Sequence, residues 1–370
     1  MSNIQHPISN KNNIVILTHM SPDGDAMGSS LGMYWYLKQT KPEASVHVIV
    51  PNAFPDFLAW LPGAAEIVIY DQKREQAEQL LEAAEAVIIL DFNEPKRIGS
   101  LGTKFLEVLA AKGEALQVLV IDHHIVSGER TLPDSPNVTK HIDASKSSTC
   151  QFLFELLFPL GEENRHQLSI RCKQIERTLN SQLSTCIYTG LMTDTGNFAF
   201  NSNKPELYEI IAQLVKAGVD KDAIYNKVFN AWSADRMKLV GYCLYRKMRI
   251  FPEYHTALIY LSGKELYPFN FKTGDAEGIV NMPLSIKDVY YSCFMREDKV
   301  QPFEEPFANG SKKKIKISMR SQGDRPVNTF CHDIFSGGGH KNASGGEYYG
   351  PLEEAVKLFL NNYEKYFSRD

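Results

Sequence analysis

The sequence predicts an α/β protein whose N-terminal part contains a parallel sheet with helices on both faces. Short apolar runs alternate with helical patterns from residue 14 to about residue 231. A short apolar run bounded by turn residues is typical of a buried parallel strand. Three of these runs, at residues 14–18, 87–90 and 118–121, are followed at once by acidic or histidine residues. We therefore expect polar side chains to gather at one edge of the sheet.

The other elements of the N-terminal part follow from the same patterns. Between and after these strands we expect a further strand at 46–50 and helices at 26–37, 72–86, 101–112, from about 150, and 182–193. Small residues open the first of these helices, and they permit close approach of the backbone. Gly113 is expected to end the helix at 101–112.

A second, smaller α/β unit is expected toward the C-terminus. Around Trp232 the pattern changes to an amphipathic helix with several basic residues, which we interpret as a connector. Beyond it we expect strands at 256–260, 288–294 and 314–319, a loop or hairpin tip at 301–313, and a helix at 352–366. We thus predict an N-terminal domain at 1–231, a connector helix at 232–250 and a second domain at 251–370. The length of 370 residues also favours two domains.

Composition narrows the class of protein. With 43% hydrophobic and 23% charged residues, the chain is ordinary globular material. A net charge of −4 argues against a protein that coats long nucleic acid, although a small phosphorylated substrate in a local basic pocket fits. The six cysteines show no C-x-x-C pairing, which indicates reduced thiols. The polar N-terminus and the absence of a run long enough to span a bilayer predict a cytoplasmic protein.

Acidic and histidine residues follow three of the expected strands. They are His19, Asp23 and Asp25 after the first, Asp91 after the next, and Asp122, His123 and His124 after the third. We expect Asp194 to be a contributor from a fourth strand end. Crowded carboxylates repel one another unless a cation neutralises them, and mixed His/Asp ligands suit Mn²⁺ and related ions. The pattern predicts a two-metal hydrolytic centre.

Each segment also has a simpler interpretation. Pro22-Asp23-Gly24 is a strong turn signal, and Asp122 could cap a helix at the start of a solvated loop. The metal hypothesis is favoured because the simpler interpretation would have to hold at four separate segments.

Two segments of the C-terminal unit carry residues suited to anion binding. Arg320 lies at the end of an expected strand, and its guanidinium group can bind phosphate through two hydrogen bonds. Residues 336–346 are rich in glycine around His340, and such a backbone can present several N–H groups to an anion. The alternative is a flexible surface loop without a ligand.

With these residues in view, the chain resembles the DHH phosphoesterase family. The resemblance rests on His19-x-x-x-Asp23-x-Asp25, Asp91 with Pro95 and Arg97, the triplet Asp122-His123-His124, Asp194, and the C-terminal segments Ser318-Met-Arg-Ser321 and Gly337-Gly-Gly-His340. It covers nearly the whole chain and implies a DHH domain followed by a DHHA1 domain. Ser336 replaces the first of four glycines common in the family, and Asn93 stands where relatives often have Ser or Asp. These departures bear on substrate preference more than on activity.

The resemblance implies a role for each motif residue. One metal ion is held by His19, Asp23 and Asp91, and the second by Asp25, Asp91, His123 and Asp194, so that Asp91 bridges them. Asp122 orients a ring nitrogen of His123 or His124, and His124 faces the scissile phosphate. The substrate's terminal phosphate or sugar is bound by the DHHA1 residues Arg320, Ser321, Gly338, Gly339 and His340.

Within the family, the layout most resembles bifunctional oligoribonucleases that also act as 3′-phosphoadenosine 5′-phosphate phosphatases. This implies hydrolysis of short oligoribonucleotides to mononucleotides by water that two divalent ions activate. Mn²⁺ is favoured, with Mg²⁺ and Co²⁺ as alternatives. The implied partners are short single-stranded RNA and small phosphorylated nucleotides, without long duplexes or membranes, and a homodimer fits.

Two other functions stay open at this point. One is a phosphodiesterase acting mainly on linear dinucleotides from cyclic-di-AMP breakdown, which the sequence does not separate from an oligoribonuclease. The other is a nucleotide-binding regulator without hydrolytic activity, which the complete set of presumed metal ligands disfavours.

Overall fold

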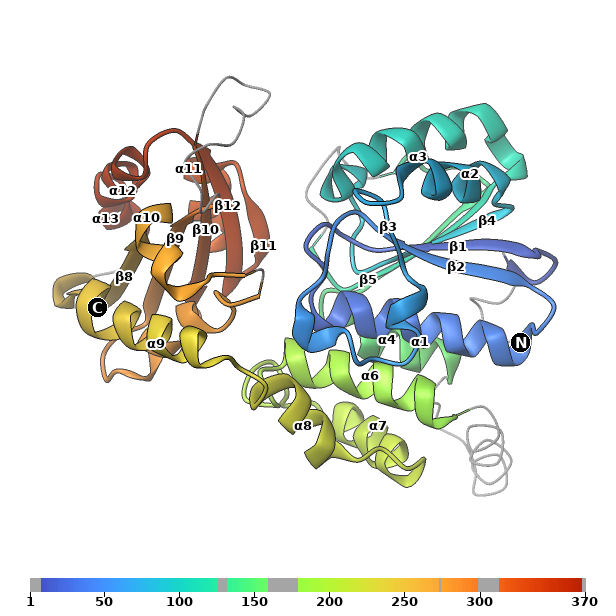
Figure 1. The fold of residues 1–370 in the computed structure, drawn as a ribbon, viewed down its shortest axis with the longest axis horizontal. Helices are drawn as coiled ribbons and strands as arrows, with labels where there is room; N and C mark the ends of the chain where they lie inside the picture. The colour runs from blue at the N-terminus through green and yellow to red at the C-terminus, as the bar shows by residue number, and fades with distance from the viewer. Residues whose placement is uncertain (1–7, 126–131, 159–178, 273, 299–312, 368–370) are drawn as a thin grey trace. The chain divides into compact units, whose positions relative to one another are not determined.

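The computed structural model describes residues 8–125, 132–158, 179–272, 274–298 and 313–367 of the chain (Figure 1). The chain forms two compact units, Met1–Ala231 and Trp232–Asp370. Within the described residues, each unit contains one six-stranded sheet. None of the described helices combines the length and the apolar character needed to cross a membrane.

The sheet of the first unit is parallel throughout, as predicted. Its order is β3-β2-β1-β4-β5-β6, and every neighbouring pair runs in the same direction. The strands are β1 (Asn13–Leu17), β2 (Ser45–Val50), β3 (Val68–Ile69), β4 (Ala86–Leu90), β5 (Gln117–Asp122) and β6 (Val138–Ile142). All five residues of β4 are buried, as expected for a central strand covered on both faces.

Helices cover both faces of this sheet, which confirms the predicted fold class (Figure 1). The helices on one face are α1 (Gly24–Thr40), α4 (Thr149–Leu157) and α6 (Ser181–Asp194), and those on the other are α2 (Arg74–Ala83) and α3 (Gly99–Lys112). α7 (Pro205–Lys216) and α8 (Lys221–Phe229) pack onto the first group. Successive residues of β1 alternate between the two cores, with Ile14 and Ile16 in one and Val15 and Leu17 in the other.

A glycine permits the close contact between α1 and α6. A Cβ atom at Gly28 would lie 2.5 Å from the carbonyl oxygen of Cys186, which is backbone and cannot turn aside. The small residues at the start of α1 therefore fix how near this helix lies to α6.

The second unit is a smaller α/β unit with a mixed sheet. Its order is β11-β12-β10-β9-β8-β7, and β8 and β9 form the parallel pair among antiparallel neighbours in the described residues. The strands are β7 (Arg249–Phe251), β8 (Thr256–Leu261), β9 (Tyr291–Glu297), β10 (Lys314–Ser321), β11 (Gly338–His340) and β12 (Ala343–Tyr349). One face packs against α11 (Asn328–Phe335), α12 (Leu352–Leu360) and α13 (Tyr363–Tyr366), and the other against α9 (Ala234–Tyr242) and α10 (Gly263–Leu266).

The segment predicted as a connector helix at 232–250 has a different structure. α9 ends at Tyr242, a π-helical turn follows at Cys243–Lys247, and β7 begins at Arg249. The apolar face of α9 packs into a core of the second unit through Leu239 and Val240. Burial of that face makes the segment part of the second unit, so it is no free-standing connector.

Three further boundaries of the second unit differ from the predictions. β9 begins at Tyr291 and not at Asp288, whose φ of 64° is incompatible with an extended strand. The C-terminal helix is interrupted between α12 and α13 at 361–362. The loop predicted at 301–313 lies outside the described residues except for Lys313.

Candidate metal centre

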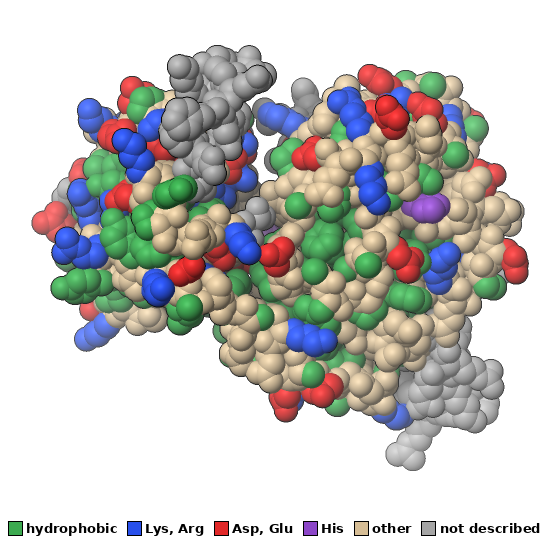
Figure 2. All heavy atoms as spheres, in the orientation of Figure 1, with side chains coloured by type: hydrophobic (Ala, Val, Ile, Leu, Met, Phe, Trp, Pro, Cys, Tyr) green, Lys and Arg blue, Asp and Glu red, His purple; other side chains and the backbone are tan. Residues whose placement is uncertain are grey.

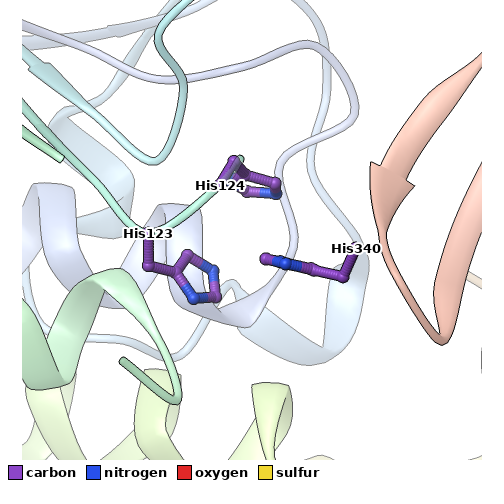
Figure 3. Close-up of side chains that lie close together, drawn as sticks. All are labelled: His123, His124 and His340. Carbon is purple, nitrogen blue, oxygen red and sulfur yellow. The ribbon is translucent and has the colours of Figure 1, made fainter. Parts of the chain in front are cut away.

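The structure brings the polar residues of the first unit together at the carboxyl ends of β1, β4 and β5. These three strands are neighbours in the order β1-β4-β5, so the residues that follow them share one edge of the sheet. Figure 3 shows the side chains of His123 and His124 at the end of β5. Among the described residues of the first unit, three groups have ligand atoms within 4.8 Å of one another: His19, Asp23 and Asp91; Asp25, His123 and Asp194; and Asp91, Asp122 and His124.

The position predicted for Asp194 was wrong in one respect. Asp194 is the last residue of helix α6 and does not follow a strand. The helix ends in a Schellman motif, in which the N–H of Asn197 bonds to Met192 O at 2.7 Å and that of Gly196 to Thr193 O at 3.1 Å. Asp194 Oδ2 nevertheless lies 3.5 Å from His123 Nε2, because α6 packs against α1 beside the cluster. The C-terminal end of a helix carries partial negative charge, which favours a cation there.

Backbone carbonyl groups orient the rings of His19 and His123 in the same way. Nδ1 of His19 lies 3.0 Å from Met20 O, and Nδ1 of His123 lies 3.3 Å from Lys146 O. Because a carbonyl oxygen only accepts, each Nδ1 must carry the proton, and this leaves Nε2 as the basic atom of the neutral ring. Ligating histidines commonly donate their other ring N–H to a carbonyl in this way.

Asp91 lies between the two histidines. Its Oδ2 is 3.1 Å from His19 Nε2, and its Oδ1 is 3.6 Å from His123 Nε2. Asp91 is 1% exposed and has a φ of 67°, in the left-handed region that a residue other than glycine rarely adopts. Such strain concentrates at functional sites, where the surrounding fold maintains it. The two carboxylate oxygens therefore face the two halves of the cluster.

Asp25 accepts hydrogen bonds from the N-terminus of α4. The N–H groups of Thr149 and Cys150 donate to Asp25 Oδ2 and Oδ1 at 2.6 and 2.9 Å. Ser148 caps the same helix by accepting from Gln151 N at 3.0 Å. The positive end of a helix stabilises a carboxylate, so Asp25 is fixed by the fold itself.

Thr149 is a site residue that the sequence analysis missed. Its hydroxyl donates to Asp91 Oδ1 at 2.8 Å while its N–H donates to Asp25, so one residue contacts two presumed ligands. A Ser-Ser-Thr sequence before an apolar run signals a helix N-terminus. That signal locates the start of α4, but not the neighbour that the hydroxyl meets.

Asp122 is paired with His124, which decides between the two histidines left open above. Oδ1 of Asp122 accepts from His124 Nδ1 at 2.8 Å and from its backbone N–H at 3.2 Å. Asn93 donates to the other oxygen of Asp122 at 2.6 Å. An amide at position 93 therefore satisfies a fully buried carboxylate, where an aspartate would repel it.

The electrostatics of the cluster favour a cation. Burial lowers the pKa of His123, but the carboxylates of Asp194, Asp25 and Asp91 outweigh burial and raise it to about 9. Burial and the neighbouring carboxylates Asp91 and Asp194 raise the pKa of Asp25 well above its ordinary value. The carboxylates contribute to both shifts, and a divalent cation would neutralise the negative charge that they bring together.

The donor set fits divalent metal ions. Asp23 caps α1 by accepting from Asp25 N and Ala26 N through Oδ1, and that oxygen lies 3.9 Å from His19 Nε2. Imidazole and carboxylate groups in this mixture suit Mn²⁺ and similar ions.

The residues predicted to bind substrate lie on the sheet of the second unit. Arg320 on β10 pairs with Ala343 on β12, and Ala343 pairs with His340 on β11. Paired residues point to the same face, so Arg320 and His340 share a face two strands apart, roughly 10 Å. Ser321 is different, because its hydroxyl donates to Arg325 O and accepts from Asn342 Nδ2.

The glycine-rich segment at 336–346 is a paired hairpin, so the alternative of a flexible loop does not hold. Gly338 and Gly339 pair with Gly345 and Ser344. A Cβ atom at Gly339 would lie 2.6 Å from Ala343 O, and its φ is 136°. Glycine is needed there for close strand packing, whereas a Cβ atom at Gly338 would meet open space.

Comparisons with known proteins agree with this geometry. The family described as "DHH family, N-terminal domain" matches residues 13–191. A solved structure of an exopolyphosphatase-related protein from Bacteroides fragilis is 41% identical, covers 98% of this chain and 95% of its own, and superposes with a TM-score of 0.80.

Two curated relatives carry the same printed name. A bifunctional oligoribonuclease and PAP phosphatase NrnA from Thermus thermophilus is 32% identical over 56% of this chain, and the match spans 50% of the Thermus protein. The Bacillus subtilis protein of the same name is 23% identical over 96% of this chain and 95% of its own length. The matched domain contains the residues that form most of the cluster, and residues 13–191 of the chain therefore form a DHH-family domain.

Proposed function

We propose that this protein is a metal-dependent phosphoesterase that hydrolyses short oligoribonucleotides to mononucleotides. We also propose that it removes the 3′-phosphate of 3′-phosphoadenosine 5′-phosphate. The observation that supports this most directly is the position of Asp91, whose two oxygens face Nε2 of His19 and of His123. The printed names of the Thermus and Bacillus relatives support the choice of substrates.

The proposed ligand sets are those that the family resemblance implies. His19, Asp23 and Asp91 would hold one divalent cation, and Asp25, Asp91, His123 and Asp194 the other. Two bound ions would supply a water of lowered pKa and positive charge for the phosphoryl oxygens. Mn²⁺ is the ion we favour, with Mg²⁺ and Co²⁺ to be compared.

His124 is the proposed proton carrier. Because Nδ1 of His124 donates to Asp122, its Nε2 is the atom that gains or releases a proton. A protonated His124 would donate to a phosphoryl oxygen and stabilise the charge that develops there. Asp122 acts as a positioning residue, since it holds the ring through one oxygen and is held by Asn93 through the other.

In the second unit, Arg320 and His340 are proposed to bind the terminal phosphate or sugar of the substrate. Gly338 has the open space to let a ligand approach its backbone, and Gly339 and Ser321 shape the two strands beside it. A guanidinium group makes two parallel bonds to a phosphate, which fits a small anionic substrate.

Short single-stranded RNA and small nucleotides are the proposed partners, with no long duplex. On the face shown in Figure 2, acidic and basic side chains are interspersed over both units. Long duplexes are bound mainly through clusters of basic side chains that neutralise many phosphates. The cytoplasmic location and the homodimer stay predictions.

A substrate panel tests the proposal. It contains di- to decaribonucleotides, 3′-phosphoadenosine 5′-phosphate, linear and cyclic di-adenylate, pyrophosphate and, because of the Bacteroides neighbour, polyphosphate. We expect kcat/KM with Mn²⁺ to be highest on the shortest oligoribonucleotides and on 3′-phosphoadenosine 5′-phosphate. Preference for linear di-adenylate alone would favour the dinucleotide phosphodiesterase. Binding without turnover of any substrate, with metal loading verified, would favour the non-hydrolytic regulator.

A further inference from the structure

The segment after α6 has an unusual backbone. Gly196, Asn197 and Phe198 have φ values of 56°, 57° and 64°, so three consecutive residues lie in the left-handed region. L-residues normally enter this region singly. Glycine and asparagine tolerate it, whereas a phenylalanine is disfavoured there. Contacts of the surrounding fold must therefore hold this turn in place.

Thr195 and the core supply these contacts. The hydroxyl of Thr195 accepts from the N–H of Phe198 at 3.0 Å, and its carbonyl oxygen accepts from the N–H of Phe200 at 2.9 Å. The ring of Phe198 packs edge-on against Tyr188, with ring centres 5.9 Å apart. The left-handed turn thus directs Phe198 toward the core.

The same turn leaves Phe200 exposed. Phe200 is 51% exposed, and its ring lies over Gly196, where a Cβ atom would be 2.6 Å from the ring. The backbone bond to Thr195 fixes the position of the residue. The strained backbone therefore presents a large aromatic ring at the surface, although burying it would be favourable.

Both ends of the segment lie beside the candidate metal centre. At its start, Asp194 Oδ2 lies 3.5 Å from His123 Nε2. At its end, Asn201 Nδ2 donates to Lys146 O at 3.4 Å, and the same carbonyl lies 3.3 Å from His123 Nδ1. Ser147 adds a bond from its hydroxyl to Asn201 O at 2.6 Å. Phe200, directly before Asn201 in the chain, therefore lies on a segment whose two ends are beside the cluster.

We propose that the exposed ring of Phe200 stacks on a nucleobase of the substrate whose phosphate lies at the cluster. The inference rests on the proposed function and adds to it a specificity residue for nucleotides. Stacking on an aromatic side chain is tolerant of base identity, because every base has a π-face. A rigid ring beside a phosphate site would thus distinguish nucleotides from phosphate esters that lack a base.

A binding experiment tests the stacking directly. The probe is 2-aminopurine riboside 5′-monophosphate, whose fluorescence is quenched on stacking, added to the metal-loaded protein. We expect the wild type and Phe200→Tyr to quench it, and the apparent Kd to rise about 5- to 100-fold in Phe200→Ala and Phe200→Leu. Phe200→Leu keeps an apolar side chain and guards against misfolding of the alanine variant. Tyr208→Ala, at a 50% exposed aromatic on α7, is the matched control and should bind as the wild type does.

Hydrolysis provides the second readout. Phe200→Ala should raise KM for diadenylate about tenfold or more, with less change in kcat. Two further substrates each lack the base at one of the two nucleotides of diadenylate. Phe200→Ala should leave kcat/KM unchanged for the one that lacks the stacked base, and this result identifies which base stacks.

The outcomes separate this inference from the proposed function. Three outcomes would overturn the stacking. The wild type does not quench the probe, Phe200→Ala quenches it as strongly as the wild type does, or Phe200→Ala loses kcat/KM equally on both abasic substrates. Loss of quenching in Phe200→Ala, in a protein that hydrolyses no oligoribonucleotide or 3′-phosphoadenosine 5′-phosphate, supports the stacking and refutes the proposed function.

Discussion

Thr149→Val should weaken metal binding without disturbing the fold. The substitution removes the hydroxyl that donates to Asp91 Oδ1 at 2.8 Å, and it retains the N–H that donates to Asp25. Valine has nearly the same shape as threonine, and α4 still begins at Ser148. The change therefore acts on the orientation of one carboxylate.

The structure sets the size of the effect. Thr149 and Asp91 are both buried, so water cannot replace the lost donor. A hydrogen bond to a charged group contributes about 1.5–3 kcal/mol. This corresponds to about 10- to 100-fold in metal affinity, the range found when an outer partner of a ligand is removed. Removing the donor also makes Asp91 a stronger base, but we expect the loss of orientation to dominate.

Calorimetric titration of the metal-free protein with Mn²⁺ measures this prediction. Thr149→Ser keeps the hydroxyl and should recover most of the affinity. Thr189→Val is the matched control, because Thr189 is equally buried but donates to Thr185 O within α6. A Kd for Thr149→Val within twofold of the wild type, or below it, would refute the reasoning and show that the hydroxyl only competes with the metal for Asp91.

Four further predictions address other parts of the chain. Asp91→Ala should abolish turnover; more than a few per cent of wild-type activity at saturating Mn²⁺ would exclude a bridging role. Arg320→Ala should keep its metal content and raise KM by an amount worth about 1.5–3 kcal/mol, and Arg320→Lys should recover part of this loss. If Arg320→Ala slows a substrate without the terminal phosphate as much as the phosphorylated one, Arg320 does not bind that phosphate. In denaturant titration, Asn197→Gly should have the same free energy of unfolding as the wild type, and Asn197→Val should have one about 1–2 kcal/mol lower. Equal stability of the valine variant and the wild type would argue against the left-handed turn. Burial raises the pKa of Glu265, but hydrogen bonds from Lys247 and Ser262 outweigh burial and lower it to about 2. Glu265→Gln should therefore lower the free energy of unfolding at pH 7 by about 1–2 kcal/mol, a value discounted for the partial exposure of the side chain. That cost should shrink as the pH falls from about 5 toward 2, because protonation removes the same charge; a constant difference would refute it.

The sequence predicted the first unit well because strand, turn and ligand share one local pattern. Each of β1, β4 and β5 is a short apolar run, and the polar residues come at its end or just after it. Parallel strands place their carboxyl ends at one edge, so the grouping of His19, Asp91 and Asp122 follows from chain order and sheet type.

The features that sequence could not predict depend on packing between distant segments. Asp194 reaches the cluster from a helix because α6 packs on α1, and Thr149 meets Asp91 across 58 positions of sequence. Phe200 follows a glycine that signals the end of a helix, but nothing local shows that Asn197 and Phe198 also turn left-handed. The pairing of Gly339 is similar, because only the close approach of β12 explains that glycine.

Two helix ends of opposite polarity meet at the candidate metal centre, and they affect different presumed ligands. The N-terminus of α4 donates two N–H groups to Asp25, which offset part of the cost that burial and the neighbouring carboxylates impose on its charge. Asp194 lies at the C-terminus of α6, where the partial negative charge adds to its own and a cation is favoured. His19 and His123 are fixed in turn through backbone carbonyls. The fold therefore holds the ligand framework by bonds that need no metal, and it concentrates the unbalanced negative charge where a divalent ion would bind.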